Sequence, residues 1–181
     1  MIEITDTEAV RRCKAGDRRA FDVLLKRHER MVYNLALRMV RDSDDAADVT
    51  QSVFIKVYEK LDGFDEQYKF FSWLYRIAVN EALSYLEHRK REQRLDGIDA
   101  AEEEEETVDD ELVERDQQIQ EGLMALKEEH RALIILKHMQ GLSYEEIGQI
   151  LDIPLKMVKS RLYSARQQLK DLLKGKGMSL T

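Results

Sequence analysis

Residues 141–174 constrain the fold most strongly, because apolar side chains recur there at helical spacing on both sides of a proline. Ser143 and Glu146 form a capping-box pattern, which predicts a helix from Ser143 to about Leu151. Pro154 disfavours helical geometry in the residue before it, so this helix should end there and a second one should follow. Spacings of three and four predict a buried stripe on the second helix, made of Val158, Leu162, Ala165, Leu169 and Leu172.

The opposite side of this second helix is polar and basic. It combines cations, hydroxyls and one aromatic ring on one face: Lys156, Lys159, Ser160, Tyr163 and Ser164, with Arg166 nearby. A short helix, a tight turn and a basic second helix are typical of the helix-turn-helix, whose second helix enters the DNA major groove. An ordinary helical hairpin with a solvated lysine face is the alternative, but packing alone would not require this mixture.

The rest of the chain also favours helices. Its 181 residues include a single proline, and no stretch alternates with period two for long enough to demand a sheet. We therefore expect an all-α fold. Cys13 is the only cysteine, so it indicates a small packing residue or a reactive thiol, and no disulfide framework, metal cluster or cofactor site is expected.

The net charge of −7 is unevenly distributed. Residues 96–116 contain twelve acidic residues against one arginine, a net charge of −11, which leaves +4 for the remainder of the chain. Such a block is typical of a self-repelling, disordered segment. The sequence thus predicts two small helical domains, residues 1–95 and 117–181, joined by a flexible acidic linker over residues 96–116.

Several further helices are expected. In the first domain, Thr7 or Asp6 would cap a helix ending at Lys14, and apolar periodicity predicts helices over residues 18–40, 45–61 and 70–94. The helix over 45–61 should turn four apolar residues inward: Ala47, Phe54, Val57 and Leu61. Two more helices, over residues 117–127 and 128–139, would pack beneath the helix-turn-helix.

Residues 70–94 begin with four aromatic rings in six positions and continue with cations. Trp73 and Ile77 are four residues apart and are expected to be buried together. Aromatic rings beside arginines and an amide also suit single-stranded nucleic acid, whose bases stack on the rings. Residue pattern alone therefore leaves two interpretations open, a helical core or a strand-binding platform.

Three segments together resemble the extracytoplasmic-function (ECF) sigma factors of bacterial RNA polymerase. They are residues 45–61 (DAADVTQSVFIKVYEKL), 70–92 (FFSWLYRIAVNEALSYLEHRKRE) and 141–169. The resemblance covers nearly the whole chain. It implies an alternative sigma factor that binds core RNA polymerase and directs promoter-specific transcription initiation, including minus-ten strand opening.

The resemblance also assigns roles to individual residues. The surface that docks on polymerase would comprise Asp45, Asp48, Gln51, Phe54, Ile55 and Tyr58. A loop over residues 64–70 and the helix after it would capture the minus-ten DNA as a single strand. The contact residues would be Phe64, Tyr68, Lys69, Phe70, Arg76 and Asn80. The minus-thirty-five duplex would contact Lys156, Lys159, Ser160, Tyr163, Ser164 and Arg166.

The resemblance has further implications for partners and for the linker, and one alternative function remains. The resemblance implies an anti-sigma factor that covers the polymerase-binding surfaces. The acidic linker resembles a connector that enters an electropositive polymerase channel, although a simple tether is the other interpretation. A stand-alone helix-turn-helix regulator would explain the C-terminal domain but not residues 45–94.

An enzyme is not expected, since no phosphate loop, metal-spaced His/Cys set or nucleophile with a base is present. No apolar run approaches the roughly 18 residues that a membrane span needs. The N-terminus also lacks a signal-peptide pattern. We therefore expect a cytoplasmic protein without membrane insertion.

Overall fold

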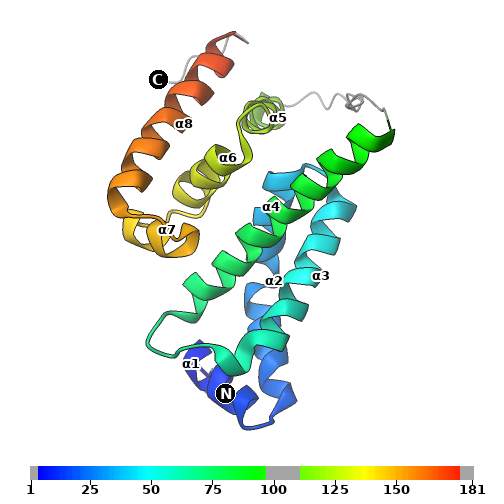
Figure 1. The fold of residues 1–181 in the computed structure, drawn as a ribbon, viewed down its shortest axis with the longest axis vertical. Coiled ribbons are helices and arrows are strands. Elements are labelled where there is room, and N and C mark those ends of the chain that lie inside the picture. Colours follow the sequence, from blue (N-terminus) through cyan, green and yellow to red (C-terminus); the bar gives the residue numbers. More distant parts are fainter. Residues whose placement is uncertain (1–3, 97–110, 176–181) are drawn as a thin grey trace. The chain divides into compact units, whose positions relative to one another are not determined.

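Every regular element is helical in the parts of the chain that the structure, a computed structural model, describes: residues 4–96 and 111–175 (Figure 1). This confirms the all-α prediction. Most of the predicted acidic linker, residues 97–110, lies outside the described residues. Within the described ranges, no helix combines the length and the apolar character needed to cross a membrane.

The N-terminal part contains α1 (Asp6–Lys14), α2 (Arg18–Val40), α3 (Ser43–Lys60), a 3-10 turn η1 (Leu61–Gly63) and α4 (Phe70–Asp96). Short polar side chains start the first three helices. Thr5 caps α1, in place of the expected Thr7 or Asp6, by accepting a hydrogen bond from Glu8 N at 3.2 Å. Asp17 and Asp42 cap α2 and α3 in the same way.

The core of this part is formed by inward residues of all four helices, including Val10, Leu24, Leu35, Met39, Val53, Val57, Leu74, Tyr75 and Val79. Ala47 was expected in this core and is exposed; its neighbour Ala46 is buried instead. The reason is helical periodicity, because Ala46, Val49 and Val53 are spaced by three and four. Trp73 and Ile77, which were expected to be buried together, are only partly buried.

Cys13 is half-buried, and burial raises the pKa of its thiol. This favours the packing role over that of a reactive thiol.

The C-terminal part contains α5 (Glu111–Met124), α6 (Glu128–Ile134), its π-helical continuation η2 (Ile135–Met139), α7 (Tyr144–Leu151) and α8 (Leu155–Gly175). α5 begins at Glu111 and not at Gln117, so the last residues of the expected linker are helical. The guanidinium of Arg131 is buried and donates to the carbonyl oxygens of Leu123 and Met124, both at 2.9 Å. These bonds satisfy carbonyls at the end of α5 and fix the α5–α6 corner.

The helix-turn-helix has the predicted local signals. Glu146 N donates to Ser143 Oγ at 3.1 Å while Ser143 N donates to Glu146 Oε2 at 3.0 Å, which is the capping box. The buried stripe of α8 ends in Leu173, which is 1% exposed, whereas Leu172 is 37% exposed. That difference follows from packing against α5, where a Cβ on Gly122 would lie 3.2 Å from Leu173 Cδ2.

Candidate functional site

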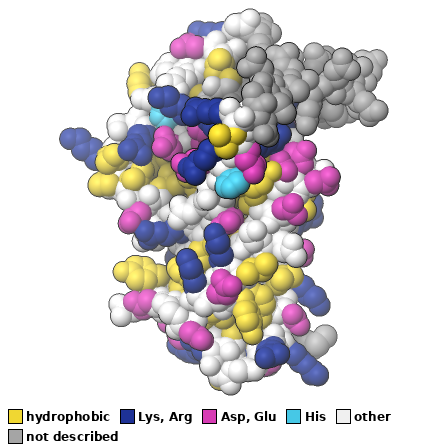
Figure 2. Space-filling model, turned by 45° about the vertical axis from the view of Figure 1, so that its right-hand side comes forward, with side chains coloured by type: hydrophobic (Ala, Val, Ile, Leu, Met, Phe, Trp, Pro, Cys, Tyr) yellow, Lys and Arg dark blue, Asp and Glu magenta, His cyan; other side chains and the backbone are white. Residues whose placement is uncertain are grey.

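A groove with a volume of about 1030 Å³ is lined by α2 and α3. Its apolar and aromatic lining comes from both helices, with charged residues of both signs among them: Phe21, Leu25, Lys26, Glu29, Arg30 and Tyr33 from α2, and Ala47, Thr50, Gln51, Phe54, Ile55, Tyr58 and Glu59 from α3. On the face seen in Figure 2, hydrophobic side chains likewise reach the surface in patches between acidic and basic ones. An apolar groove with charged residues around it suits a protein partner better than a nucleic acid.

Four of the six residues expected at a polymerase contact line this groove. Ile55 and Tyr58 are each 52% exposed, and the Tyr58 ring meets the Phe21 ring edge-on, with 5.1 Å between centroids. Phe54 was expected both to face inward and to belong to the contact; it is 6% exposed and forms part of the groove's interior surface. Asp45 and Asp48 lie on the first two turns of α3 and do not line the groove.

Sequence reasoning missed the contribution of α2 to this groove. Phe21 and Leu25 belong to the apolar periodicity that predicted this helix, and both are only partly buried. The signal that could have revealed this is the width of the apolar face of α2. Because Leu24, His28 and Val32 already fill the side that faces the core, Phe21 and Leu25 lie beside that side.

The loop over residues 64–69 joins η1 to α4, and a cluster of aromatic side chains packs at its two ends. The rings of Phe64, Phe70 and Trp73 pack on one another with centroid distances of 5.0 to 5.9 Å. Phe64 is 5% exposed and Phe70 is 4% exposed. These two rings were expected to contact a DNA strand; in this conformation they are covered and anchor the two ends of the loop.

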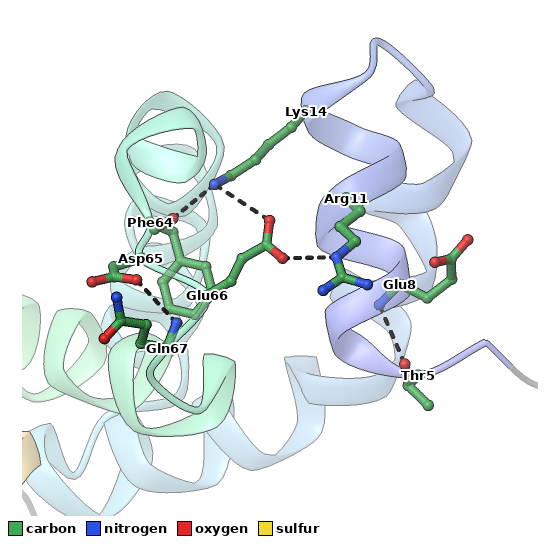
Figure 3. A network of polar contacts seen from close by, with 8 residues as sticks. All are labelled: Thr5, Glu8, Arg11, Lys14, Phe64, Asp65, Glu66 and Gln67. Carbon is green, nitrogen blue, oxygen red and sulfur yellow. Dashed lines mark hydrogen bonds and ion pairs between the residues drawn. The ribbon is translucent and has the colours of Figure 1, made fainter.

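Other expected strand-contact residues are accessible. Tyr68, at the far end of the loop, is 62% exposed, and Lys69 and Asn80 are exposed as well. Arg76 is partly exposed on α4. The loop is also held from α1, since Lys14 Nζ donates to the carbonyl oxygen of Phe64 at 2.7 Å (Figure 3).

The exposed face of α8 presents five of the six residues expected at duplex DNA. Lys156, Lys159, Ser160, Tyr163 and Ser164 are exposed, and Tyr163 is 65% exposed. Arg166 does not belong to this face: it is partly buried and its Nε donates to Nε2 of His138 at 3.0 Å. Arg166, which was also expected at the duplex, is therefore engaged with η2 in this conformation.

Both serine hydroxyls on this face are occupied within the helix. Ser164 Oγ donates to Ser160 O at 3.2 Å, and Ser160 Oγ donates to Met157 O at 3.3 Å. Each hydroxyl oxygen still has an acceptor side for an incoming donor. The combination of a basic helix, accessible hydroxyls and an exposed tyrosine is suited to phosphate and base-edge contacts in the major groove.

Comparison with known proteins identifies a family for each part of the chain. The sigma-70 region 2 family matches residues 24–92, and the sigma-70 region 4 family matches residues 116–169. The ECF RNA polymerase sigma-E factor of Escherichia coli (strain K12) is 36% identical over 179 residues, which span 92% of this chain and 93% of the relative. Its counterpart in Haemophilus influenzae is 34% identical over 181 residues, spanning 93% and 95%.

The chain belongs to the ECF sigma factors. It is an alternative sigma factor that directs promoter-specific transcription by RNA polymerase, which confirms the predicted family and function. The region 2 match includes the 64–69 loop and every residue that lines the α2–α3 groove except Phe21. The region 4 match includes the five exposed residues of α8 expected at the duplex.

Two solved structures share this fold. CnrH in complex with the cytosolic domain of CnrY superposes with a TM-score of 0.72 at 24% identity, covering 94% of this sigma factor and 97% of that chain. The sigma factor RpoE from Bartonella quintana, in complex with the anti-sigma factor NepR, gives a TM-score of 0.69 at 29% identity, covering 85% and 96%.

Proposed function

We propose that this sigma factor is a dissociable, non-catalytic initiation factor of the cytoplasm, whose α2–α3 groove docks on core RNA polymerase. The observation that supports the proposal most directly is the coincidence of the groove with four of the expected contact residues: Gln51, Phe54, Ile55 and Tyr58. Exposed apolar side chains in a groove are typical anchors for an amphipathic partner helix. Asp45 and Asp48 would then make peripheral charged contacts beside the groove.

Co-purification with core polymerase tests the docking site. Ile55→Glu places a charge in the groove and should weaken polymerase binding, because an unpaired carboxylate would be desolvated in the complex. Lys60→Glu changes charge on the same helix at a position that does not line the groove, and serves as the control. Equal retention of polymerase by both variants would rule out the groove. A stand-alone DNA-binding regulator would show no polymerase retention at all.

We propose a second role for the 64–69 loop and α4, in capture of the melted minus-ten strand. The accessible residues Tyr68 and Lys69 on the loop, with Arg76 and Asn80 on α4, supply a ring, cations and an amide. Bases stack on such rings while phosphates meet the cations. Phe64 and Phe70 support this surface from beneath and are not part of the contact.

Strand capture can be separated from duplex binding by comparing two templates. Arg76→Ala and Asn80→Ala should slow open-complex formation on a linear promoter, and a promoter mismatched across the minus-ten region should restore much of the rate. The reason is that mismatches remove an unpairing cost of a few kcal/mol. Equal defects on both templates would mean that these residues serve the fold or the polymerase.

The exposed face of α8 is the proposed contact for the minus-thirty-five duplex, with Lys156, Lys159, Ser160, Tyr163 and Ser164 as the contact residues.

We propose domains over residues 1–95 and 117–181, connected by residues 96–116. The helical start of α5 lies inside that connection. We also propose an anti-sigma partner, because the related sigma factor RpoE was solved in complex with the anti-sigma factor NepR.

A further inference from the structure

The 64–69 loop carries two carboxylates, Asp65 and Glu66, between its aromatic anchor and its accessible residues. Near the phosphates of a DNA strand, unpaired carboxylates would be repelled. Asp65 is turned into the loop itself, since its Oδ1 accepts a hydrogen bond from Gln67 N at 2.9 Å and its carbonyl accepts from Tyr68 N at 3.1 Å. These bonds form a local turn that fixes the backbone leading to Tyr68.

Glu66 is held by two cations of α1, as Figure 3 shows. Arg11 Nε donates to Glu66 Oε2 at 2.7 Å, and Lys14 Nζ lies 3.9 Å from Glu66 Oε1. Lys14 also donates to the carbonyl oxygen of Phe64 at 2.7 Å, with its ammonium 5.9 Å from the centre of the Phe64 ring. Side chains of α1 therefore bind both a backbone carbonyl and a carboxylate of the loop.

The two cations are not equivalent. The side chain of Lys14 is 25% exposed, whereas that of Arg11 is 62% exposed. Ion pairs as exposed as that of Arg11 contribute little to folding stability. The contact of Lys14 with a partly buried carbonyl is less screened and sets the position of the loop backbone.

We propose that Lys14 and Arg11 are positioning residues for strand opening, which hold the 64–69 loop in place and neutralise Glu66. The DNA strand then meets Gln67, Tyr68 and Lys69, while Glu66 is neutralised and the Asp65 carboxylate is hydrogen-bonded within the loop. This inference rests on the proposed role of the loop in strand capture. It assigns a function to α1, a helix that precedes the region 2 match at residues 24–92.

Single variants of the complete sigma factor, bound to core polymerase, test the positioning role. Lys14→Met keeps the aliphatic stem and removes the ammonium, and it should slow open-complex formation on a linear promoter by about 10-fold, as expected for a lost charged hydrogen bond. Polymerase binding and closed-complex affinity should be unchanged. Arg12→Ala is the matched control, because Arg12 lies on the same helix and pairs with Glu8, not with the loop.

A rescue experiment tests the charge role separately. The double variant of Arg11→Ala with Lys14→Met should open the promoter more slowly than either single variant, since Glu66 is then free to face the strand. Adding Glu66→Gln should recover part of the rate, because the carboxylate is gone. A purely structural role predicts no recovery, so equal or lower rates in the triple variant would overturn the neutralisation.

The outcomes distinguish this inference from the proposed function. If Tyr68→Ala opens a linear promoter normally, the loop does not capture the strand and both proposals fail. If Tyr68→Ala is defective and Lys14→Met is normal, only the positioning role of α1 is overturned. Thermal unfolding of each variant, compared with Arg12→Ala, shows whether a slow rate reflects a loss of folded protein.

Discussion

Arg166 donates a hydrogen bond from Nε to Nε2 of His138 at 3.0 Å, and this contact joins the middle of α8 to η2. The bond requires His138 Nε2 to be unprotonated, since only then does the nitrogen accept. Partial burial, followed by the nearby charges of Arg166 and Lys137, lowers the pKa of His138 from its ordinary 6.5. The folded C-terminal part thus favours the neutral imidazole.

Stability of the C-terminal part should therefore fall in acid. The unfolded chain binds the His138 proton more readily than the folded one, so the contribution is complete above about pH 6.5 and is lost as the pH falls toward the lower folded pKa. His138→Gln keeps an acceptor that does not titrate, and its loss of melting temperature from about pH 7.5 to about pH 5.5 should be smaller than that of the wild type. His130→Gln, which alters a histidine paired with Gln168, is the control. Parallel pH dependence in wild type and His138→Gln would contradict the prediction.

Lys159→Ala and Ser160→Ala should weaken promoter use without affecting polymerase binding. Each lost contact to a base edge is worth about 1–3 kcal/mol. The measurement is transcription from a cognate promoter alongside co-purification with core polymerase. Lys127→Ala removes an exposed lysine at the start of α6 and should leave both unchanged. Loss of polymerase binding in Lys159→Ala would show that α8 has a different partner.

Adjacent residues of α3 should differ in their effect on folding. Phe54→Ala removes a buried ring and should lower the free energy of unfolding by about 3–5 kcal/mol. Ile55→Ala alters a side chain that is 52% exposed and should change it by about 0.5 kcal/mol or less. Chemical denaturation of the two variants decides. A small effect of Phe54→Ala would indicate that the groove tolerates a change in its interior surface.

Gly122 should not accept a larger residue. A Cβ at this position would lie 2.9 Å from Leu169 Cδ1 and 3.2 Å from Leu173 Cδ2, so Gly122→Val must displace α8 or its side chains. Overpacking of this kind costs about 1–3 kcal/mol of stability. Gly175→Val is the comparison, because nothing lies within 4 Å of the Cβ position there. Thermal unfolding that ranks the two variants equally would mean that α5 and α8 separate at little cost.

The acidic segment should reduce non-specific DNA binding. Replacing the five glutamates at 102–106 with glutamine keeps the chain length and removes five negative charges. We expect higher affinity of the free sigma factor for duplex DNA at low salt, and a smaller gain as the salt concentration rises. Fluorescence anisotropy with non-promoter DNA measures it. Unchanged affinity at low and moderate salt would argue against any electrostatic role.

Local signals in the sequence predicted much of the fold. Both ends of α2 were predicted, as were the capping box of Ser143 and the proline break before α8, because these depend on neighbouring residues. The start of α5 was placed too late, since repulsion between acidic side chains was given more weight than the helix propensity of the segment. Ala47 and Leu172 were predicted to be buried, but in each case a directly adjacent residue, Ala46 or Leu173, is buried instead.

The candidate site was less accessible to sequence reasoning. Burial of Phe64 and Phe70 depends on Trp73 packing against both rings, and an aromatic-rich loop does not reveal which of its rings are covered. The Arg11–Glu66 pair joins residues 55 positions apart, with no local pattern to indicate it. Contacts of this kind arise only when the helices pack, so they become visible only in three dimensions.

One side of α8 is buried in its domain and the other is exposed, and this separation affects how such proteins can diversify. Val158, Leu162 and Ala165 are buried and hold the helix to its domain, while Lys159, Ser160 and Tyr163 are exposed. If the exposed side contacts the promoter as proposed, substitutions there change which promoters are read at little cost in folding. A duplicated copy of this chain could acquire a new set of target genes through a few changes there, while keeping the same polymerase.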